Sequence, residues 1–206
     1  MKPVRVAKSR LLGLPEPVRE DLVVAMAADT VVAALACPLV AAVYVVTDDL
    51  LTATAVRACG ATPVADLPGA GLNPALTHGA GVATRERPGC GVAALAADLP
   101  AVTPAELEVA LVAAGRHRRA LVSDSDRTGT TMLTAAPGVP LAPTYGADSR
   151  RRHVAGGAVE LALARCEGLS RDVDTMEDLM AAERLGVGRH TRALLAGSAT
   201  RGRPAE

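Results

Sequence analysis

Short apolar runs alternate along this chain with longer segments that mix apolar and polar residues. Apolar runs that stop at polar residues are typical of buried strands, and longer segments opened or closed by Pro and Gly are typical of helices. The alternation predicts one α/β domain whose mostly parallel sheet is flanked by helices. Helices are expected over 16–36, 50–58, 74–85, 103–114, 156–165 and 175–185, and strands over 43–46, 62–65, 91–95, 120–123 and 131–135.

The two ends of the chain differ in character. Residues 1–188 carry the alternating pattern and fit a single domain, whereas residues 189–206 are rich in Arg, Gly, Ser and Thr. We expect 189–206 to form a short, partly disordered tail, because polar termini without an apolar face have little to hold them in place.

Composition excludes several classes of protein. Lys plus Arg and Asp plus Glu are equal, at 22 each, so the chain lacks the basic excess of a nucleic-acid-binding protein. There is no Trp or Phe, so we expect a core of Ala, Val and Leu. The longest apolar stretch, 18–46, is broken by charged residues and cannot span a bilayer. Four scattered cysteines without a CxxC pair indicate a reduced, cytoplasmic protein.

Acidic residues follow two of the apolar runs. Asp98 follows the run at 91–95, and Asp172 and Asp174 lie on one side of an extended segment. Because ligands bind beyond the carboxyl ends of strands in open α/β sheets, these carboxylates are candidate Mg²⁺ ligands. The structural alternative is that Asp98 only ends a turn and that Asp174 or Thr175 caps the last predicted helix.

The N-terminal segment is a candidate phosphate-binding loop. Lys2, Lys8 and Arg10 lie close together ahead of the first predicted helix, and Lys2 and Lys8 are the only lysines in the chain. Clustered cations entering a helix can bind a triphosphate. The alternative is a solvated basic N-terminus, since neither GxxxxGK[ST] nor GxGxxG is present.

A polar, glycine-containing region could bind a small phosphorylated acid. It comprises Thr128 to Thr131 and Tyr145 to His153, which supply hydroxyls, glycine backbone and three consecutive arginines. The arginines could equally form a solvated helix face. The histidines, including His153, have no metal-ligand spacing, so we expect them to be surface or helix residues.

Taken in order, these segments resemble the guanylyltransferases that join GMP from GTP to phosphoenolpyruvate or 2-phospho-L-lactate in coenzyme F-420 biosynthesis. The resemblance runs from residue 2 to about residue 195, and the ordered set is more specific than any one motif. The matching segments are Lys2-Pro3, Ala7 to Leu11, Val45 to Asp48, Gly71 to Asn73, Ala97 to Pro100, Thr128 to Thr130, Tyr145-Gly146, Ser149, Arg152-His153, Gly157-Ala158, Arg171 to Thr175, and Leu185 to Gly188 with Thr191.

The resemblance implies a Rossmann-like nucleotidyltransferase domain and a role for each candidate residue. Lys2, Lys8 and Arg10 would contact the GTP phosphates, and Asn73 would lie in the nucleotide pocket with Asp98. The implied Mg²⁺ ligands are Asp98 and Asp172, with Asp174 nearby. The implied site for phosphoenolpyruvate comprises Thr130, Gly146, Ser149 and Arg152.

The sequence departs from the family at its start. Family members have a hydrophobic first strand before the Lys-Pro motif, and this chain begins on that motif, so we expect the first strand to be missing from it and Met1 to be an internal residue. Three alternatives stay open: another nucleotidyltransferase of the molybdopterin-guanine or sugar-phosphate type, a non-catalytic nucleotide-binding module, and 2-phospholactate or 3-phosphoglycerate as the acceptor. Ala- and Leu-rich helices would permit a homodimer.

Overall fold

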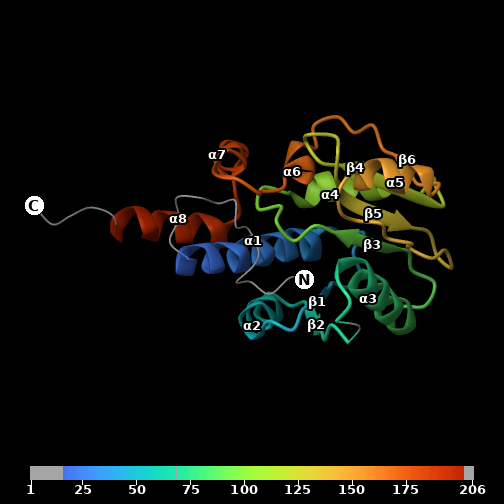
Figure 1. The fold of residues 1–206 in the computed structure, drawn as a ribbon, viewed down its shortest axis with the longest axis horizontal. Coiled ribbons are helices and arrows are strands. Elements are labelled where there is room, and N and C mark those ends of the chain that lie inside the picture. The colour runs from blue at the N-terminus through green and yellow to red at the C-terminus, as the bar shows by residue number, and fades with distance from the viewer. Residues whose placement is uncertain (1–15, 68, 202–206) are drawn as a thin grey trace, which may run out of the picture.

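The structure, a computed structural model, describes residues 16–67 and 69–201 and places helices on the faces and ends of two sheets (Figure 1). Most of the predicted elements are present, with boundaries that differ by a few residues. The helices are α1 (Glu16–Ala36), α2 (Leu50–Ala58), α3 (Leu72–Glu86), α4 (Pro104–Ala114), α5 (Ser149–Ala155), α6 (Glu167–Ser170), α7 (Met176–Leu185) and α8 (Arg189–Arg201), and the strands are β1 (Tyr44–Val46), β2 (Thr62–Val64), β3 (Val92–Leu95), β4 (Arg119–Ser123), β5 (Thr130–Ala135) and β6 (Val159–Glu160).

The strands form two sheets within the described residues. Strands β1 and β2 are a parallel pair, and the larger sheet has the order β3-β5-β4-β6. Strand β5 is antiparallel to β3 and β4, whereas β6 is parallel to β4. The larger sheet is therefore mixed, and the expectation of mostly parallel pairing is wrong for it. A short turn joins β4 to β5, and a turn of that length can connect only antiparallel neighbours.

The predicted helix over 156–165 is also wrong. Helix α5 lies earlier, at Ser149–Ala155, and it ends at Gly156 and Gly157. Gly157 has a φ of +87°, a left-handed conformation that favours glycine and cannot continue a helix. The apolar residues that follow run instead beside β4, where Val159 pairs with Ala120.

Residues after 188 form a helix, so the expectation of a frayed tail is wrong up to Arg201. Helix α8 packs against α1 (Figure 1), and the carboxylate of Asp29 accepts hydrogen bonds from the backbone amides of His190, at 2.9 Å, and Thr191, at 2.8 Å. Asp29 is buried, and these amides satisfy its charge in the way that an N-cap does. A Cβ at Gly188 would collide with the Asp29 carboxyl group, so this approach requires glycine.

The core consists of small and aliphatic side chains, as the composition predicts. Its largest cluster lies between α1, α4 and the larger sheet and contains Leu99, Leu107, Met132 and Leu169. Of the cysteines, Cys37 and Cys166 are buried, Cys59 is half-buried and Cys90 is exposed, and all four are free thiols. No helix in the described part of the chain is both long and apolar enough to cross a bilayer.

Candidate functional site

The two segments that carry the predicted carboxylates Asp98 and Asp172 lie side by side. Asp98 follows β3, and Asp172 follows α6. The backbone amide of Val173 donates a 3.1 Å hydrogen bond to the carbonyl of Asp98, which joins the two segments directly. Thr175, with Asp178, caps α7 through a reciprocal capping box, as one of the structural alternatives predicted, so the cap is not Asp174.

The ionised form of Asp172 is disfavoured at this position. Burial, followed by the charges of Asp98, Asp174 and Asp124, raises the pKa of Asp172 to about 7. A carboxylate that is desolvated beside other carboxylates is stabilised by a bound cation, because the cation offsets both effects. The electrostatics therefore favour a cation among these acidic side chains.

The donor atoms available to such a cation are carboxylate oxygens, the ligands that Mg²⁺ prefers. Across residues 16–67 and 69–201, no three or more His, Cys, Asp or Glu side chains are grouped closely enough to hold a metal ion by themselves. The residues fit a hard cation that takes one or two carboxylates and completes its shell with water and substrate phosphate, which is how Mg²⁺ is usually held.

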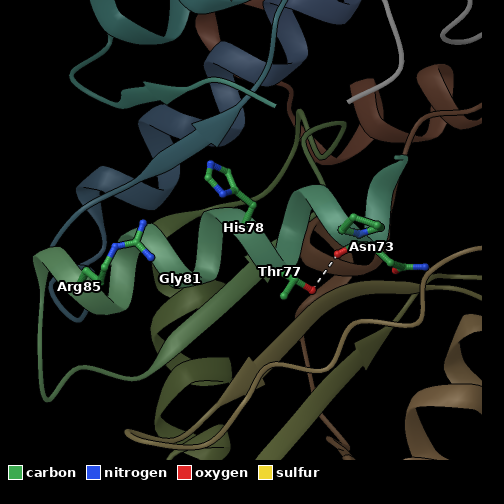
Figure 2. Close-up of a pocket in the computed structure, with 6 residues that line it drawn as sticks. Asn73, Thr77, His78, Gly81 and Arg85 are labelled. Carbon is green, nitrogen blue, oxygen red and sulfur yellow. Dashed lines mark hydrogen bonds between the residues drawn. The ribbon is translucent and has the colours of Figure 1, made fainter. Parts of the chain in front are cut away.

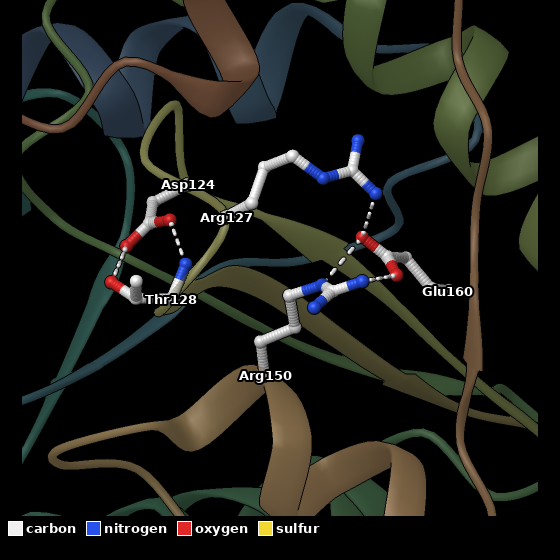
Figure 3. A network of polar contacts seen from close by, with 5 residues as sticks. All are labelled: Asp124, Arg127, Thr128, Arg150 and Glu160. Carbon is white, nitrogen blue, oxygen red and sulfur yellow. Dashed lines mark hydrogen bonds and ion pairs between the residues drawn. The ribbon is translucent and has the colours of Figure 1, made fainter.

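Asp124 is a member of this acidic group that the sequence analysis missed. It begins the turn between β4 and β5, and its carboxylate accepts a hydrogen bond from the backbone amide of Thr128, at 2.9 Å (Figure 3). A second hydrogen bond comes from the backbone amide of Gly129, at 2.6 Å. This is the way in which an Asp side chain stabilises a tight turn. Asp124 therefore combines a structural role in the turn with an electrostatic effect on Asp172.

A partly exposed ion pair fixes the same turn to α5 and β6. Arg150 binds Glu160 with two hydrogen bonds, of 2.8 Å from Nε and 2.6 Å from Nη2, and the backbone amide of Arg150 donates to the Thr128 carbonyl at 3.2 Å. Arg127 adds a 3.1 Å contact to Glu160 (Figure 3). The hydrogen bond from Arg150 is the main cause that lowers the pKa of Glu160. At Arg150, the arginine run is thus a structural contact and not a solvated face.

The residues expected to bind the phosphorylated acid lie together next to this turn. Ser149 Oγ is 3.3 Å from Thr130 Oγ1, and the Ser149 amide donates to the Gly146 carbonyl at 3.1 Å. Gly146 has a φ of +120°, and a Cβ there would lie 2.9 Å from Nη2 of Arg152. Thr130, Gly146, Ser149 and Arg152 form what we call the acceptor cradle.

His153 lies on a helix, as one part of the expectation had it, but its side chain is buried. It belongs to α5, its side chain is 3% exposed, and it contacts both Thr130 and the backbone of Thr144. Burial is the main cause that lowers the pKa of His153, followed by the charges of Arg152 and Arg119. Its position after the three arginines was visible in the sequence, but its partners depend on the fold.

Asn73 braces the loop that carries Gly146. Its side-chain amide donates to the Tyr145 carbonyl at 3.1 Å and accepts from the Tyr145 amide at 2.7 Å. Asn73 also lies at one end of a surface groove of about 530 Å³ along α3, with Thr77, His78 and Arg85 further along the helix (Figure 2). The structure thus links the expected nucleotide residue to the acceptor cradle.

The expected triphosphate residues Lys2, Lys8 and Arg10 lie outside the described residues.

Comparisons with known proteins find relatives that are similar over most of the chain. The chain is 53% identical to the phosphoenolpyruvate guanylyltransferase of Streptomyces coelicolor over 197 residues, which is 95% of this chain and 93% of the relative. It is 51% identical to the enzyme of that name from Thermomonospora curvata over 196 residues, which is 95% of this chain and 86% of the relative. The protein of that name from Geodermatophilus obscurus is 52% identical over 204 residues, with 96% and 92% covered.

The fold has a solved counterpart. A crystal structure from Desulfovibrio desulfuricans G20, described as a nucleotide-diphospho-sugar transferase, matches with a TM-score of 0.65 over 97% of this chain and 91% of the other, at 16% identity. This confirms the expected nucleotidyltransferase-type fold. No protein-family model matches the chain. The identity to full-length relatives decides the assignment: the chain belongs to the phosphoenolpyruvate guanylyltransferase family.

Proposed function

We propose that this protein transfers GMP from GTP to the phosphate of phosphoenolpyruvate and releases pyrophosphate. The observation that supports this most directly is the position of Asp124, which connects the two halves of the site. Its charge acts on Asp172 in the acidic group, and its carboxylate holds the amide of Gly129, the residue before Thr130 of the acceptor cradle. The acidic residues that favour a cation therefore lie beside the acceptor cradle, which offers hydrogen-bond donors.

The reaction follows from the charges of the two substrates. A phosphate oxygen of phosphoenolpyruvate forms a bond to the α-phosphorus of GTP, the bond from that phosphorus to the bridging oxygen breaks, and pyrophosphate leaves with the bonding electrons. The attacking phosphate is ionised at neutral pH, so no general base is required. The chain's task is to align two anions and to reduce their repulsion.

Each part of the site has a proposed task. Asp98 and Asp172, with Asp174 nearby, would hold Mg²⁺, which when bound supplies positive charge to the GTP phosphates. Thr130, Gly146, Ser149 and Arg152 would bind the acid through hydroxyl, backbone and guanidinium donors.

The remaining proposals concern the nucleotide, the domain and the state of the enzyme in the cell. Asn73 would contribute to the nucleotide pocket through its place in the α3 groove, and Lys2, Lys8 and Arg10 would bind the triphosphate. We also propose that residues 1–188 form the catalytic domain and that the enzyme acts in the cytoplasm on GTP and a small acid, with a homodimer as its oligomeric state.

The test is turnover by the full chain with GTP and Mg²⁺. Phosphoenolpyruvate, 2-phospholactate and 3-phosphoglycerate are supplied separately, and released pyrophosphate is measured. We expect the highest kcat/KM with phosphoenolpyruvate. Preference for another acid would correct the acceptor, and binding of GTP without release of pyrophosphate in the presence of any of the three acids would refute the proposed activity.

A further inference from the structure

A chain of buried hydrogen bonds runs through the floor of the acceptor cradle. The backbone amide of Thr144 donates to His153 Nε2 at 2.8 Å, His153 Nδ1 lies 2.9 Å from Thr130 Oγ1, and Ser149 Oγ lies 3.3 Å from the same Thr130 oxygen. Thr130, Ser149 and His153 are 8%, 2% and 3% exposed. These hydrogen bonds therefore connect three side chains that are almost inaccessible to solvent.

The first hydrogen bond fixes the protonation of the imidazole. A backbone amide can only donate, so His153 Nε2 must accept and carries no hydrogen. A neutral histidine then carries its hydrogen on Nδ1, and Nδ1 must donate to Thr130 Oγ1. Burial and the neighbouring Arg152 and Arg119 lower the pKa of His153, which agrees with a neutral ring.

The fixed direction of this bond leaves one hydroxyl hydrogen without a partner in the chain. Thr130 and Ser149 have two hydroxyl hydrogens between them, and neither can be donated to His153 Nδ1. Their mutual contact uses one of the two. Across the described residues, the hydroxyl oxygens of this pair have no other hydrogen-bond partner than His153 and each other. One hydroxyl hydrogen of the pair is therefore left without an acceptor among the described residues.

We propose that His153 is a positioning residue that makes the Thr130–Ser149 hydroxyl pair a net hydrogen-bond donor toward an anionic oxygen of the acceptor substrate. A donor in this place favours a carboxylate or phosphoryl oxygen, which can only accept, over a neutral hydroxyl. This inference rests on the proposed function, because it assigns the pair to the three-carbon acid.

The ring of His153 is held in this orientation from its other side. Tyr145 packs edge-to-face against it, with ring centroids 4.9 Å apart and planes at 74°. The backbone of Tyr145 is in turn fixed by both atoms of the Asn73 side-chain amide. A rotated ring would lose the Thr144 hydrogen bond, so the packing supports a single direction of donation.

Two substitutions separate donation from simple packing. His153→Asn places an amide nitrogen near the Nδ1 position and keeps a donor for Thr130, whereas His153→Gln reaches the Nε2 position and leaves Thr130 without one. With the full chain at saturating GTP, we expect His153→Gln to raise the KM for phosphoenolpyruvate at least about tenfold, the effect of losing a hydrogen bond that involves a charged group. His153→Asn should raise it less, and the KM for GTP should change little in both.

The control is His117→Gln, which removes a histidine near the start of β4, away from the hydroxyl pair, and should leave both KM values unchanged. Inorganic phosphate and pyruvate, tested as competitive inhibitors, separate the two kinds of oxygen, since His153→Gln should weaken inhibition by whichever one the pair contacts. An equal rise for Gln and Asn, or a matching rise in the KM for GTP, would indicate a structural role and overturn the inference.

A measurement on the unsubstituted protein covers variants that fail to fold. Ring ¹⁵N chemical shifts at pH 7.5 should show His153 protonated at Nδ1 and bare at Nε2, and the opposite tautomer or an imidazolium would overturn the inference. Failure of the proposed function can be distinguished from the KM results and from the ¹⁵N results, because the unsubstituted enzyme would then release no pyrophosphate.

Discussion

The amide of Val173 donates to the carbonyl of Asp98, and this single backbone hydrogen bond aligns the chain on either side of the acidic group. It places Asp172 where the charge of Asp98 helps to raise its pKa, although the two residues come from distant parts of the sequence. The two carboxylates are therefore expected to act as a unit in holding a cation.

Substitution of either carboxylate should remove most of the activity. We expect Asp98→Asn and Asp172→Asn each to lower kcat/KM by at least about 10²-fold at saturating Mg²⁺, the size of effect seen when an electrostatic group is removed from other active sites. Asp126→Asn changes an exposed carboxyl in the nearby β4–β5 turn and serves as the control. Comparable losses in all three variants would argue for a general effect of charge, and not for a metal site.

The same Asp172→Asn substitution should stabilise the protein when Mg²⁺ is absent. The pKa of Asp172 is raised to about 7, so at pH 8 the folded state carries an ionised carboxylate in an unfavourable place. Removal of that charge should increase the free energy of unfolding by about 1 to 2 kcal/mol, less than the full shift implies because the side chain keeps some solvent contact. Thermal melts in EDTA provide the measurement, and a lower Tm in the variant would contradict this account.

The ion pair between Arg150 and Glu160 should matter more than the neighbouring contact of Arg127. Arg150 binds in a bidentate manner and is 32% exposed, whereas Arg127 makes a single contact and is 68% exposed. Arg150→Gln should therefore destabilise the fold and raise the KM for the acceptor, while Arg127→Gln should change either quantity by less than half as much. Urea unfolding and initial rates measure the two effects, and similar values for both variants would show that the bidentate geometry is unimportant.

Acidification should destabilise the wild type through His153. The pKa of His153 is lowered in the folded state, so the unfolded chain takes up a proton as the pH falls through about 6.5, the ordinary value, while the folded chain does not. The stability contributed by neutral His153 is present above that pH and is lost below it. Because Asp172 acts in the opposite direction, the quantity to measure is the difference in unfolding free energy between wild type and His153→Gln from pH 7.5 to 5.5. This difference should shrink on acidification, and a constant value would exclude the effect.

Helix α8 should detach from α1 when its anchor is disturbed. Gly188→Ala would drive a methyl group into the Asp29 carboxylate, and Asp29→Ala would leave the amides of His190 and Thr191 without their acceptor. Each should cost about 1 to 3 kcal/mol of stability. Gly115→Ala, at a position where a Cβ meets its neighbours at an ordinary 3.5 Å, is the matched control. Hydrogen exchange at the α8 amides would show the detachment, and unchanged protection would disprove it.

Elements with local signals were predictable from the sequence. Helix α4 begins where Thr103, Pro104 and Glu106 predict it, and the structure has the complete capping box there. Asp98 follows β3, as the rule that polar residues gather at strand ends predicted, whereas Asp172 follows α6 and reaches Asp98 only through the fold. For α4, the information lies within a few residues.

Elements whose stability comes from distant partners could not be predicted. Helix α8 depends on Asp29, 161 residues before His190. The tautomer of His153 depends on the Thr144 amide, and the place of Asp124 in the acidic group depends on the turn that returns β5 beside β4. None of these partners is marked by spacing, since each becomes a neighbour only through the fold.

The loop between β5 and α5 can tolerate changes of sequence that the β4–β5 turn cannot. Gly146 and Tyr145 are carried by that longer connection, which Asn73 braces through both atoms of its side-chain amide. The short turn, by contrast, serves the acidic group and the cradle at once through Asp124. For engineering a new acceptor preference, the longer connection is thus the segment to diversify, with Asn73 kept as the clamp and the turn left unaltered.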